Sequence, residues 1–97
     1  KIFQDEDLSL ASLAAALEIT PHQLSELINT RFRTGFSRYI REQRVAEARR
    51  MLEADASASV LSIGLSTGFR SQSNFYAAFR EITGEAPGTY RKRLQSR

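Results

Sequence analysis

Residues 60–84 decide the fold, and they read VLSIGLSTGFRSQSNFYAAFREITG. Residues 10–28, which read LASLAAALEITPHQLSELI, repeat the same apolar spacing about 50 residues earlier. In each stretch two runs with apolar residues three or four apart are separated by a short break, which is typical of two helices joined by a tight turn. One extra residue in the second turn changes the offset from 50 to 51, so the matching pairs are Leu10/Val60, Leu13/Ile63, Ala14/Gly64 and Ile19/Phe69, then Leu24/Phe75 and Ile28/Phe79.

Capping residues mark where these helices begin and end. Thr20 precedes Pro21, and Gln23 follows three residues after Thr20. This order predicts a capping box with proline at the first helical position. Ser71 is the expected cap of the second long helix of the repeat, and Gly84 is its expected left-handed stop. A last short helix should begin at Pro87.

A longer helix between the two repeats is predicted from about Phe36 to Ala54, after the break at Gly35. At ~1.5 Å per residue it would form a rod roughly 28 Å long. Arg44 falls inside its apolar stripe, where a charge needs a partner, so we expect a structural ion pair there. No strand pattern is visible, which predicts an all-α fold. The expected division is residues 1–34, a first helix-turn-helix subdomain; 35–55, the linker helix; and 56–97, a second helix-turn-helix subdomain.

Most of the large apolar side chains are expected in the core because they follow the buried period. Leu27 is expected to be buried beside its neighbours at positions 24 and 28. The aromatic residues are expected to pack in the core rather than to stack on bases; these are Phe32, Phe36, Phe69, Phe75 and Phe79.

Composition excludes several classes of function. The chain has no cysteine and one histidine, so it offers neither a disulfide nor a thiolate metal site. It has no glycine-rich phosphate loop and no paired carboxylates in a cleft pattern, so we expect no catalysis, no cofactor and no metal. No apolar run approaches 18 residues, which argues against a membrane span in this segment. Lys1 is not a natural start residue, so we expect a piece of a longer protein.

Charge is divided unevenly along the chain. Residues 1–30 hold one lysine against five acids, whereas residues 31–97 hold thirteen lysines and arginines against six acids. Seven arginines fall within residues 31–50. The guanidinium group suits phosphates and guanine edges, although a solvated basic face is also common in small helical proteins. This balance favours nucleic acid as a partner but does not establish it.

The second half also resembles a known family. The pattern Gly68-Phe69, Ser73, Phe75, Phe79-Arg80, Gly84, Pro87 and Tyr90-Arg91 is similar to the signature of the AraC/XylS transcription regulators of bacteria. The first half agrees with it through Leu13-Ala14 and Leu24-Ser25, and the linker agrees through Arg44, Ala48 and Leu52. The resemblance spans nearly the whole chain.

The resemblance implies a DNA-binding domain of about seven helices, with two homeodomain-like helix-turn-helix units and recognition helices near 21–30 and 72–82. Both recognition helices would enter successive major grooves of double-stranded DNA. The positions expected to face bases are His22, Gln23, Ser25 and Glu26 in the first, and Gln72, Ser73, Asn74 and Ala77 in the second. Asparagine and glutamine can bond adenine in a bidentate manner, although simple solvation is the alternative for each.

Phosphate contacts require cations, hydroxyls and helix starts beside the recognition helices. About half of the flanking cations could serve solubility alone. The candidates are Arg31, Arg33, Arg38, Arg41, Arg70, Ser71, Tyr76, Arg80, Arg91 and Lys92, with Tyr90 as a further hydroxyl.

Two departures from the family put its sequence preference in doubt. Ala77 stands where a basic residue is frequent, and Glu26 where a neutral or positive reader is common. Glu26 could accept from cytosine, but we favour a surface ion pair with Arg31 or Arg33. Affinity should therefore come mainly from flanking arginines.

The alternative function is a helical protein-interaction module whose basic face meets an acidic partner such as RNA polymerase. The resemblance allows both roles. It also implies a sensor domain outside this segment. The N-terminal stretch resembles the branch in which that domain often spans the membrane. The DNA-binding segment itself is expected in the cytoplasm. Sequence alone does not specify the operator, the direction of regulation, the effector, the regulated genes or the oligomeric state.

Overall fold

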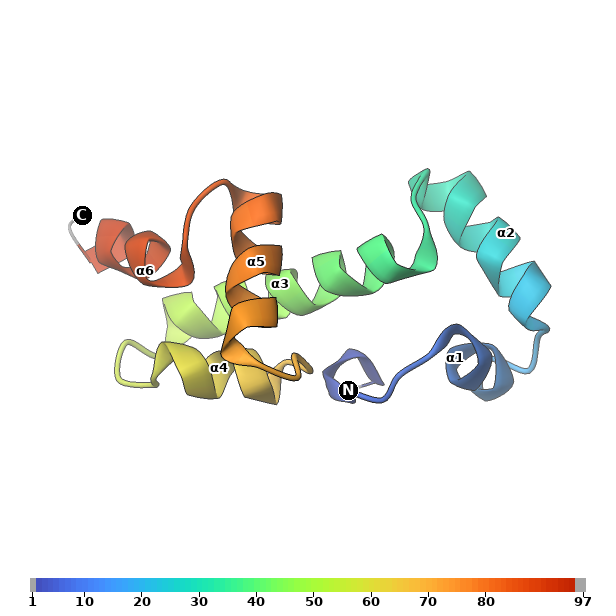
Figure 1. Cartoon of the computed structure of the whole chain (residues 1–97), viewed down its shortest axis with the longest axis horizontal. Helices are drawn as coiled ribbons and strands as arrows, with labels where there is room; N and C mark the ends of the chain where they lie inside the picture. The colour runs from blue at the N-terminus through green and yellow to red at the C-terminus, as the bar shows by residue number, and fades with distance from the viewer. Residues whose placement is uncertain (1, 96–97) are drawn as a thin grey trace.

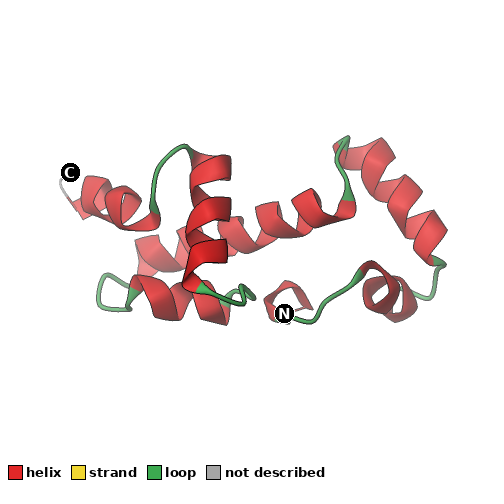
Figure 2. Cartoon of the chain, viewed as in Figure 1, coloured by secondary structure: helices red, strands yellow, loops and turns green. Residues whose placement is uncertain are grey.

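The computed structural model describes residues 2–95, and within them every regular element is helical (Figures 1 and 2). The all-α prediction is confirmed. Instead of about seven α-helices there are six, together with one short 3-10 turn, in the described part of the chain. The elements are η1 (Ile2–Gln4), α1 (Leu10–Ala16), α2 (Pro21–Phe32), α3 (Phe36–Ala54), α4 (Val60–Ser66), α5 (Gln72–Thr83) and α6 (Pro87–Gln95). Lys1 lies outside the described residues.

The predicted caps are present. The Thr20 hydroxyl accepts from the backbone N–H of Gln23 at 3.1 Å, and the Gln23 side chain accepts from the backbone N–H of Thr20 at 2.9 Å. The Ser71 hydroxyl accepts from the backbone N–H of Asn74 at 3.1 Å. Gly84 ends α5 with φ of 88°, a left-handed conformation that favours glycine. Local sequence therefore fixes the beginnings of both long repeat helices.

The helices form two units at opposite ends of α3 (Figure 1). We call η1, α1 and α2 the first unit, and α4, α5 and α6 the second unit. Each unit has its own core, and the two cores share α3. The first core contains Leu13, Ala14, Leu24, Ile28 and Ile40. The second contains Val45, Ala48, Leu52, Ile63, Phe69, Phe75, Ala78, Phe79 and Tyr90.

The molecule is elongated, with extents of 46 × 22 × 22 Å. Its long axis follows α3, and α2 and α5 cross that axis toward either end (Figure 1). Both α2 and α5 begin on the side where α1 and α4 lie and run toward the opposite side. Figure 2 shows only short loops between consecutive α-helices. The rod therefore fixes the spacing of the two crossing helices.

Two core predictions for α2 are wrong. Leu27 is 48% exposed and Phe32 is 52% exposed. Because only Leu24 and Ile28 of α2 face the core, the neighbouring positions stay at its edge. Phe32 instead packs on Tyr39, with ring centroids 4.7 Å apart. The other predicted core aromatics do pack in or against the two cores.

The expected ion pair of Arg44 is also wrong. Its guanidinium donates to backbone carbonyls instead, from Nε to Phe3 and from Nη2 to Asp5, each at 2.8 Å. It also lies 6.0 Å from the centre of the Phe69 ring. Burial lowers the pKa of Arg44, against the opposing effect of the Asp5 carboxylate. Arg44 therefore ties the N-terminal segment to α3 and to the second unit.

Candidate nucleic-acid interface

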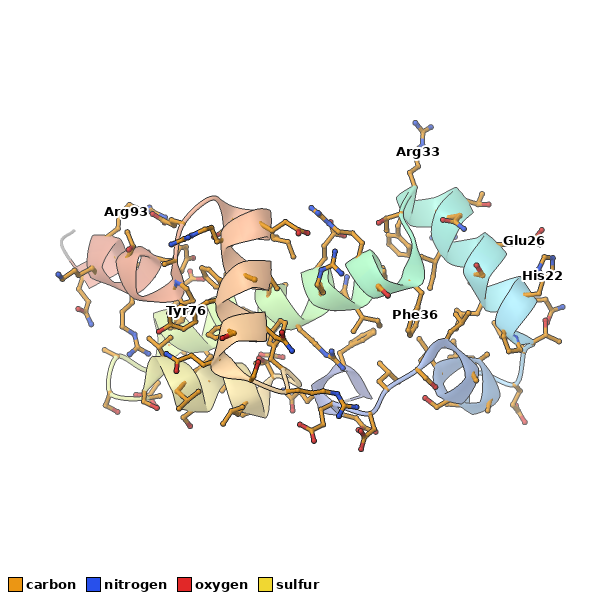
Figure 3. The ribbon with its side chains drawn as sticks, in the orientation of Figure 1. His22, Glu26, Arg33, Phe36, Tyr76 and Arg93 are labelled. Atoms are coloured by element: carbon orange, nitrogen blue, oxygen red, sulfur yellow. The ribbon has the colours of Figure 1, made fainter. Side chains whose placement is uncertain are left out.

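In the first unit, α2 presents a polar face that is directed away from the core. His22 and Glu26 lie on the outer side of α2 (Figure 3), with Nε2 of His22 3.4 Å from Oε1 of Glu26. The expected partners of Glu26 were Arg31 or Arg33, and this prediction is wrong because a partner four residues earlier lies on the same helix face. Arg33 projects from the end of α2 into solvent (Figure 3).

The other candidate base readers of α2 are less available for contact with DNA bases. The Gln23 side-chain oxygen is engaged in the capping box, so only its amide nitrogen could donate to a base. Ser25 is half-buried. The exposed polar surface of α2 therefore begins with its first turn and Glu26 and continues through Asn29, Thr30 and Arg31.

In the second unit, α5 exposes all of its candidate base readers. Phe75, Ala78 and Phe79 are buried, so α5 turns its opposite face outward. The side chains on that exposed face are Gln72, Ser73, Asn74 and Ala77. The Ser71 hydroxyl accepts from the backbone N–H of Asn74, and the side-chain amide of Asn74 remains available. The α5 surface therefore offers an amide reader beside small side chains.

Two hollows flank the exposed face of α5. The first, about 300 Å³, lies between α5, α3 and the N-terminal segment; it is lined by Glu6, Arg41, Arg44, Gly68, Phe69, Arg70, Asn74, Ala77, Ala78 and Glu81. The second, about 410 Å³, lies toward the start of α6; it is lined by Gln72, Ser73, Tyr76, Ala77, Arg80 and Ala86. The structure thus gathers candidate readers and candidate phosphate contacts around one helix.

Several candidate phosphate cations have carboxylate partners. Arg70 Nη2 lies 2.7 Å from Asp7 Oδ1. Arg38 Nη1 and Arg41 Nη2 both bind Oε1 of Glu81, at 2.6 Å and 3.2 Å. Sequence reasoning missed these acids because the contacting residues are 40 to 63 positions apart. Only the three-dimensional packing brings them together.

The remaining candidates differ in how accessible they are. Arg91 is half-buried, and its Nη2 donates to the Asp55 carbonyl at 3.1 Å. Tyr76 is partly buried against the second core. The expected phosphate role of Tyr90 is wrong, because its side chain is buried and its hydroxyl donates to Glu53 at 3.1 Å. Three exposed candidate cations have no carboxylate partner among the ion pairs of residues 2–95, and these are Arg31, Arg33 and Arg80. Lys92 is also exposed.

Neither a metal centre nor a membrane helix is found in the described part. Residues 2–95 contain no group of three or more histidine, cysteine or acidic side chains positioned to hold a metal ion. Their helices also lack the combination of length and apolarity needed for a membrane crossing.

Comparison with known proteins agrees with this architecture. A family model described as a helix-turn-helix domain matches residues 13–93. The melibiose operon regulatory protein of Escherichia coli K12 is 30% identical over 93 residues, which cover 96% of this chain and 30% of that protein. The HTH-type transcriptional regulator GlxA of Rhizobium meliloti is 32% identical over 92 residues, covering 95% and 28%. The chain thus spans under a third of the length of these relatives.

Solved structures give the same result. A transcriptional regulator from Chromobacterium violaceum, described as an AraC-type DNA-binding domain-containing protein, superposes with a TM-score of 0.84 at 29% identity. That match covers 94% of this chain and 81% of the other. The C-terminal domain of AraT, a response regulator from Geobacillus stearothermophilus, gives 0.83 at 28% identity, covering 93% and 74%. The chain therefore belongs to the AraC/XylS family of helix-turn-helix transcription regulators and is a DNA-binding domain of that family.

Proposed function

We propose that this domain reads double-stranded DNA by laying α2 and α5 in two successive major grooves on one side of the duplex. The observation that carries the proposal is the arrangement of the two helices, which run across the long axis of the molecule in the same general sense, α2 beside the first end of α3 and α5 over its second half (Figure 1). Successive major grooves on one side of B-DNA are about 34 Å apart. The 46 Å length of the molecule is sufficient for that spacing.

Sequence preference in this proposal comes from the first turns of both helices. An α-helix fits the major groove, and residues near its N-terminus reach the base edges. On α5 the Asn74 amide could bond adenine in a bidentate manner, next to Gln72 and Ser73. On α2 the corresponding readers are His22, Gln23 and Ser25. Glu26 and Ala77 supply no positive charge, so these two faces discriminate between bases more than they attract DNA.

Affinity comes from the arginines that flank the helices. Arg70 precedes α5, Arg31 and Arg33 close α2, and Arg38 and Arg41 lie on α3 between the two. Attraction of such cations to phosphate is independent of sequence and falls steeply with salt. We therefore expect a strong salt dependence for the isolated domain.

The partners of the parent protein follow from the family resemblance alone. We propose a sensor domain elsewhere in that protein, and its anchoring in a membrane stays a prediction. A contact with RNA polymerase also stays a prediction. Because DNA is the ligand, we place the domain in the cytoplasm of a bacterium. The interaction-module alternative has no support among the relatives described above.

Selection of bound sequences from a random duplex library tests the proposal and provides the site for two variants. Arg70→Ala should weaken binding on all sequences alike, because it removes a phosphate contact. Asn74→Ala should flatten the preference at one or two base pairs, with a loss of ~1–3 kcal/mol on the preferred base. Affinities are compared across a panel of single-base changes in the selected site. Unchanged preference in Asn74→Ala would remove that residue from the reading surface.

A further inference from the structure

Three arginines of the proposed phosphate-binding surface are held by three carboxylates. Asp7 pairs with Arg70, and Glu81 accepts from both Arg38 and Arg41. Glu42 also accepts from Nε of Arg38 at 3.0 Å, so Glu81 shares Arg38 with it. Among the ion pairs of residues 2–95, Glu81 is the only carboxylate partner of Arg41. The side chains involved are 38% to 75% exposed, so the pairs lie at the surface. Surface pairs of this kind contribute little to stability, and their charges remain accessible to other ions.

Asp7 and Glu81 are located where DNA would approach α5. Glu81 lines the hollow that also contains Asn74 and Ala77 of the proposed reading face. Glu6 lines the same hollow, and Arg70, the partner of Asp7, forms another part of its wall. Negative charge is thus placed beside the surface that a DNA phosphate must reach.

The N-terminal segment that carries Asp7 is anchored at this position. Arg44 donates to the carbonyls of Phe3 and Asp5, which ties the segment to α3. The backbone also approaches the turn of the second unit so closely that a Cβ on Gly68 would lie 2.6 Å from the Phe3 carbonyl oxygen. The Asp7–Arg70 pair therefore joins a segment of the first unit to the start of α5 in a defined place.

We propose that Asp7 and Glu81 compete with DNA phosphates for Arg70, Arg38 and Arg41 and thereby suppress binding to unrelated DNA. This inference rests on the proposed function, since it concerns the same surface. Binding without sequence preference depends almost wholly on phosphate contacts, so it should lose the most from this competition. Binding to a preferred site adds base contacts that the carboxylates do not touch, so it should lose proportionally less.

A purely structural role for the two acids predicts a different result. If they only hold α5 and the N-terminal segment in place, their neutralisation would loosen the interface and weaken binding to every duplex. Asn and Gln keep an accepting side-chain oxygen, so Asp7→Asn and Glu81→Gln can retain the hydrogen bonds to arginine while the charge is lost. The direction of the change on unrelated DNA therefore separates competition from positioning.

The experiment measures affinity of the wild type, Asp7→Asn and Glu81→Gln for two duplexes at several salt concentrations. One duplex carries the sequence obtained by selection, and the other is its scrambled counterpart. We expect each variant to bind the scrambled duplex about twofold to fivefold more tightly at low salt, and the selected duplex with a smaller gain. Asp7→Asn should also steepen the dependence of log affinity on log salt by about one.

Glu47→Gln is the matched control. Glu47 pairs with Arg50 on α3, and neither residue lines the hollow beside α5. This variant changes the net charge equally and removes an arginine partner outside the proposed surface. Any general effect of charge should therefore be the same in all three variants, and the excess in Asp7→Asn and Glu81→Gln reports competition at the surface.

The Arg70→Ala variant tests whether the effect of Asp7→Asn depends on this arginine. In Arg70→Ala, the further change Asp7→Asn should raise the affinity for scrambled DNA no more than Glu47→Gln does, because the cation for which Asp7 competes is gone. The proposal is overturned if Asp7→Asn binds scrambled DNA no more tightly than Glu47→Gln, or if its excess over Glu47→Gln persists in Arg70→Ala. Should Glu81→Gln fail to fold, the Asp7 variants decide alone. A selection that enriches no sequence would instead contradict the proposed function.

Discussion

The two helix-turn-helix units share one pattern of positions but bury very different side chains. Within residues 2–95 nine buried residues form the second core and five form the first. Phe75 and Phe79 in the second core are fully buried, with ring centroids 5.8 Å apart. Large apolar residues also remain exposed in both units, with Leu17 at 53% in the first and Leu65 at 48% in the second. A common geometry therefore does not imply equal stability, because burial of apolar area sets the free energy gained.

One pair of positions shows how the two units reach the same geometry. Ala14 and Leu24 both belong to the first core, and Gly64 and Phe75 occupy the matching positions in the second unit. A Cβ on Gly64 would overlap the ring of Phe75, lying 2.6 Å from its Cγ. The larger ring on α5 thus requires the smallest residue on α4. The smaller residue on α4 therefore compensates for the larger side chain on α5.

The largest expected effect comes from breaking this compensation. Gly64→Ala should lower the free energy of unfolding by about 3 kcal/mol, because the new methyl group overlaps a fully buried ring in a close-packed core. The reverse change in the first unit, Ala14→Gly, should cost only about 1 kcal/mol, since it adds backbone freedom and a small void. Urea unfolding of both variants, followed by circular dichroism, gives the two values.

A double variant sharpens that test. Gly64→Ala combined with Phe75→Leu reproduces the pair found in the first unit. It should recover part of the stability lost in Gly64→Ala, although Phe75→Leu alone is destabilising. Additive losses in the double variant would show that the two positions do not constrain each other.

The two turns should differ in how stability responds when the residue with positive φ is replaced. Gly68 has φ of 107°, and a Cβ there would also lie 2.6 Å from Nε of Arg44. Gly68→Ala should therefore cost about 2 kcal/mol. Glu18 at the matching position has φ of 60°, which glycine adopts without strain. Glu18→Gly should be neutral or stabilise by about 0.5 kcal/mol, as thermal unfolding can measure. Equal losses at both sites would contradict this difference between the turns.

Local opening should also distinguish the units. The amides of α1 and α2 should exchange with solvent roughly tenfold faster than those of α5 after correction for intrinsic rates, a difference of about 1.4 kcal/mol. The smaller first core is the physical reason. Hydrogen exchange followed by NMR resolves the individual helices. Equal protection of α2 and α5 would mean that the cores do not set local stability independently.

Local features of the fold could be predicted from sequence, and long-range contacts could not. Thr20, Ser71 and Gly84 act on neighbours within a few residues, so their roles were visible in the chain itself. Leu27 was expected to be buried because it lies at helical spacing beside Leu24 and Ile28, but periodicity alone does not give the width of the face that α2 buries. Arg44 was expected to need a partner, yet backbone carbonyls 39 and 41 residues away supply it.

The same difference between local features and long-range contacts holds for the candidate interface. Exposure of Asn74 and its neighbours on α5 could be inferred from the buried period of Phe75 and Phe79. The carboxylate partners of the flanking arginines could not, because an ion pair such as Arg70 with Asp7 depends on how the N-terminal segment folds back. Their DNA contacts stay predictions.

Changing the spacing between half-sites tests the central claim that both units of one rigid chain hold one duplex. The selected site is lengthened between its two halves by about half a helical turn, roughly 5 base pairs, which rotates one groove to the opposite side. Because α3 fixes the separation of α2 and α5, affinity should fall about a hundredfold, to the level of one unit alone. An affinity within about twofold of the parent site would contradict simultaneous binding by α2 and α5.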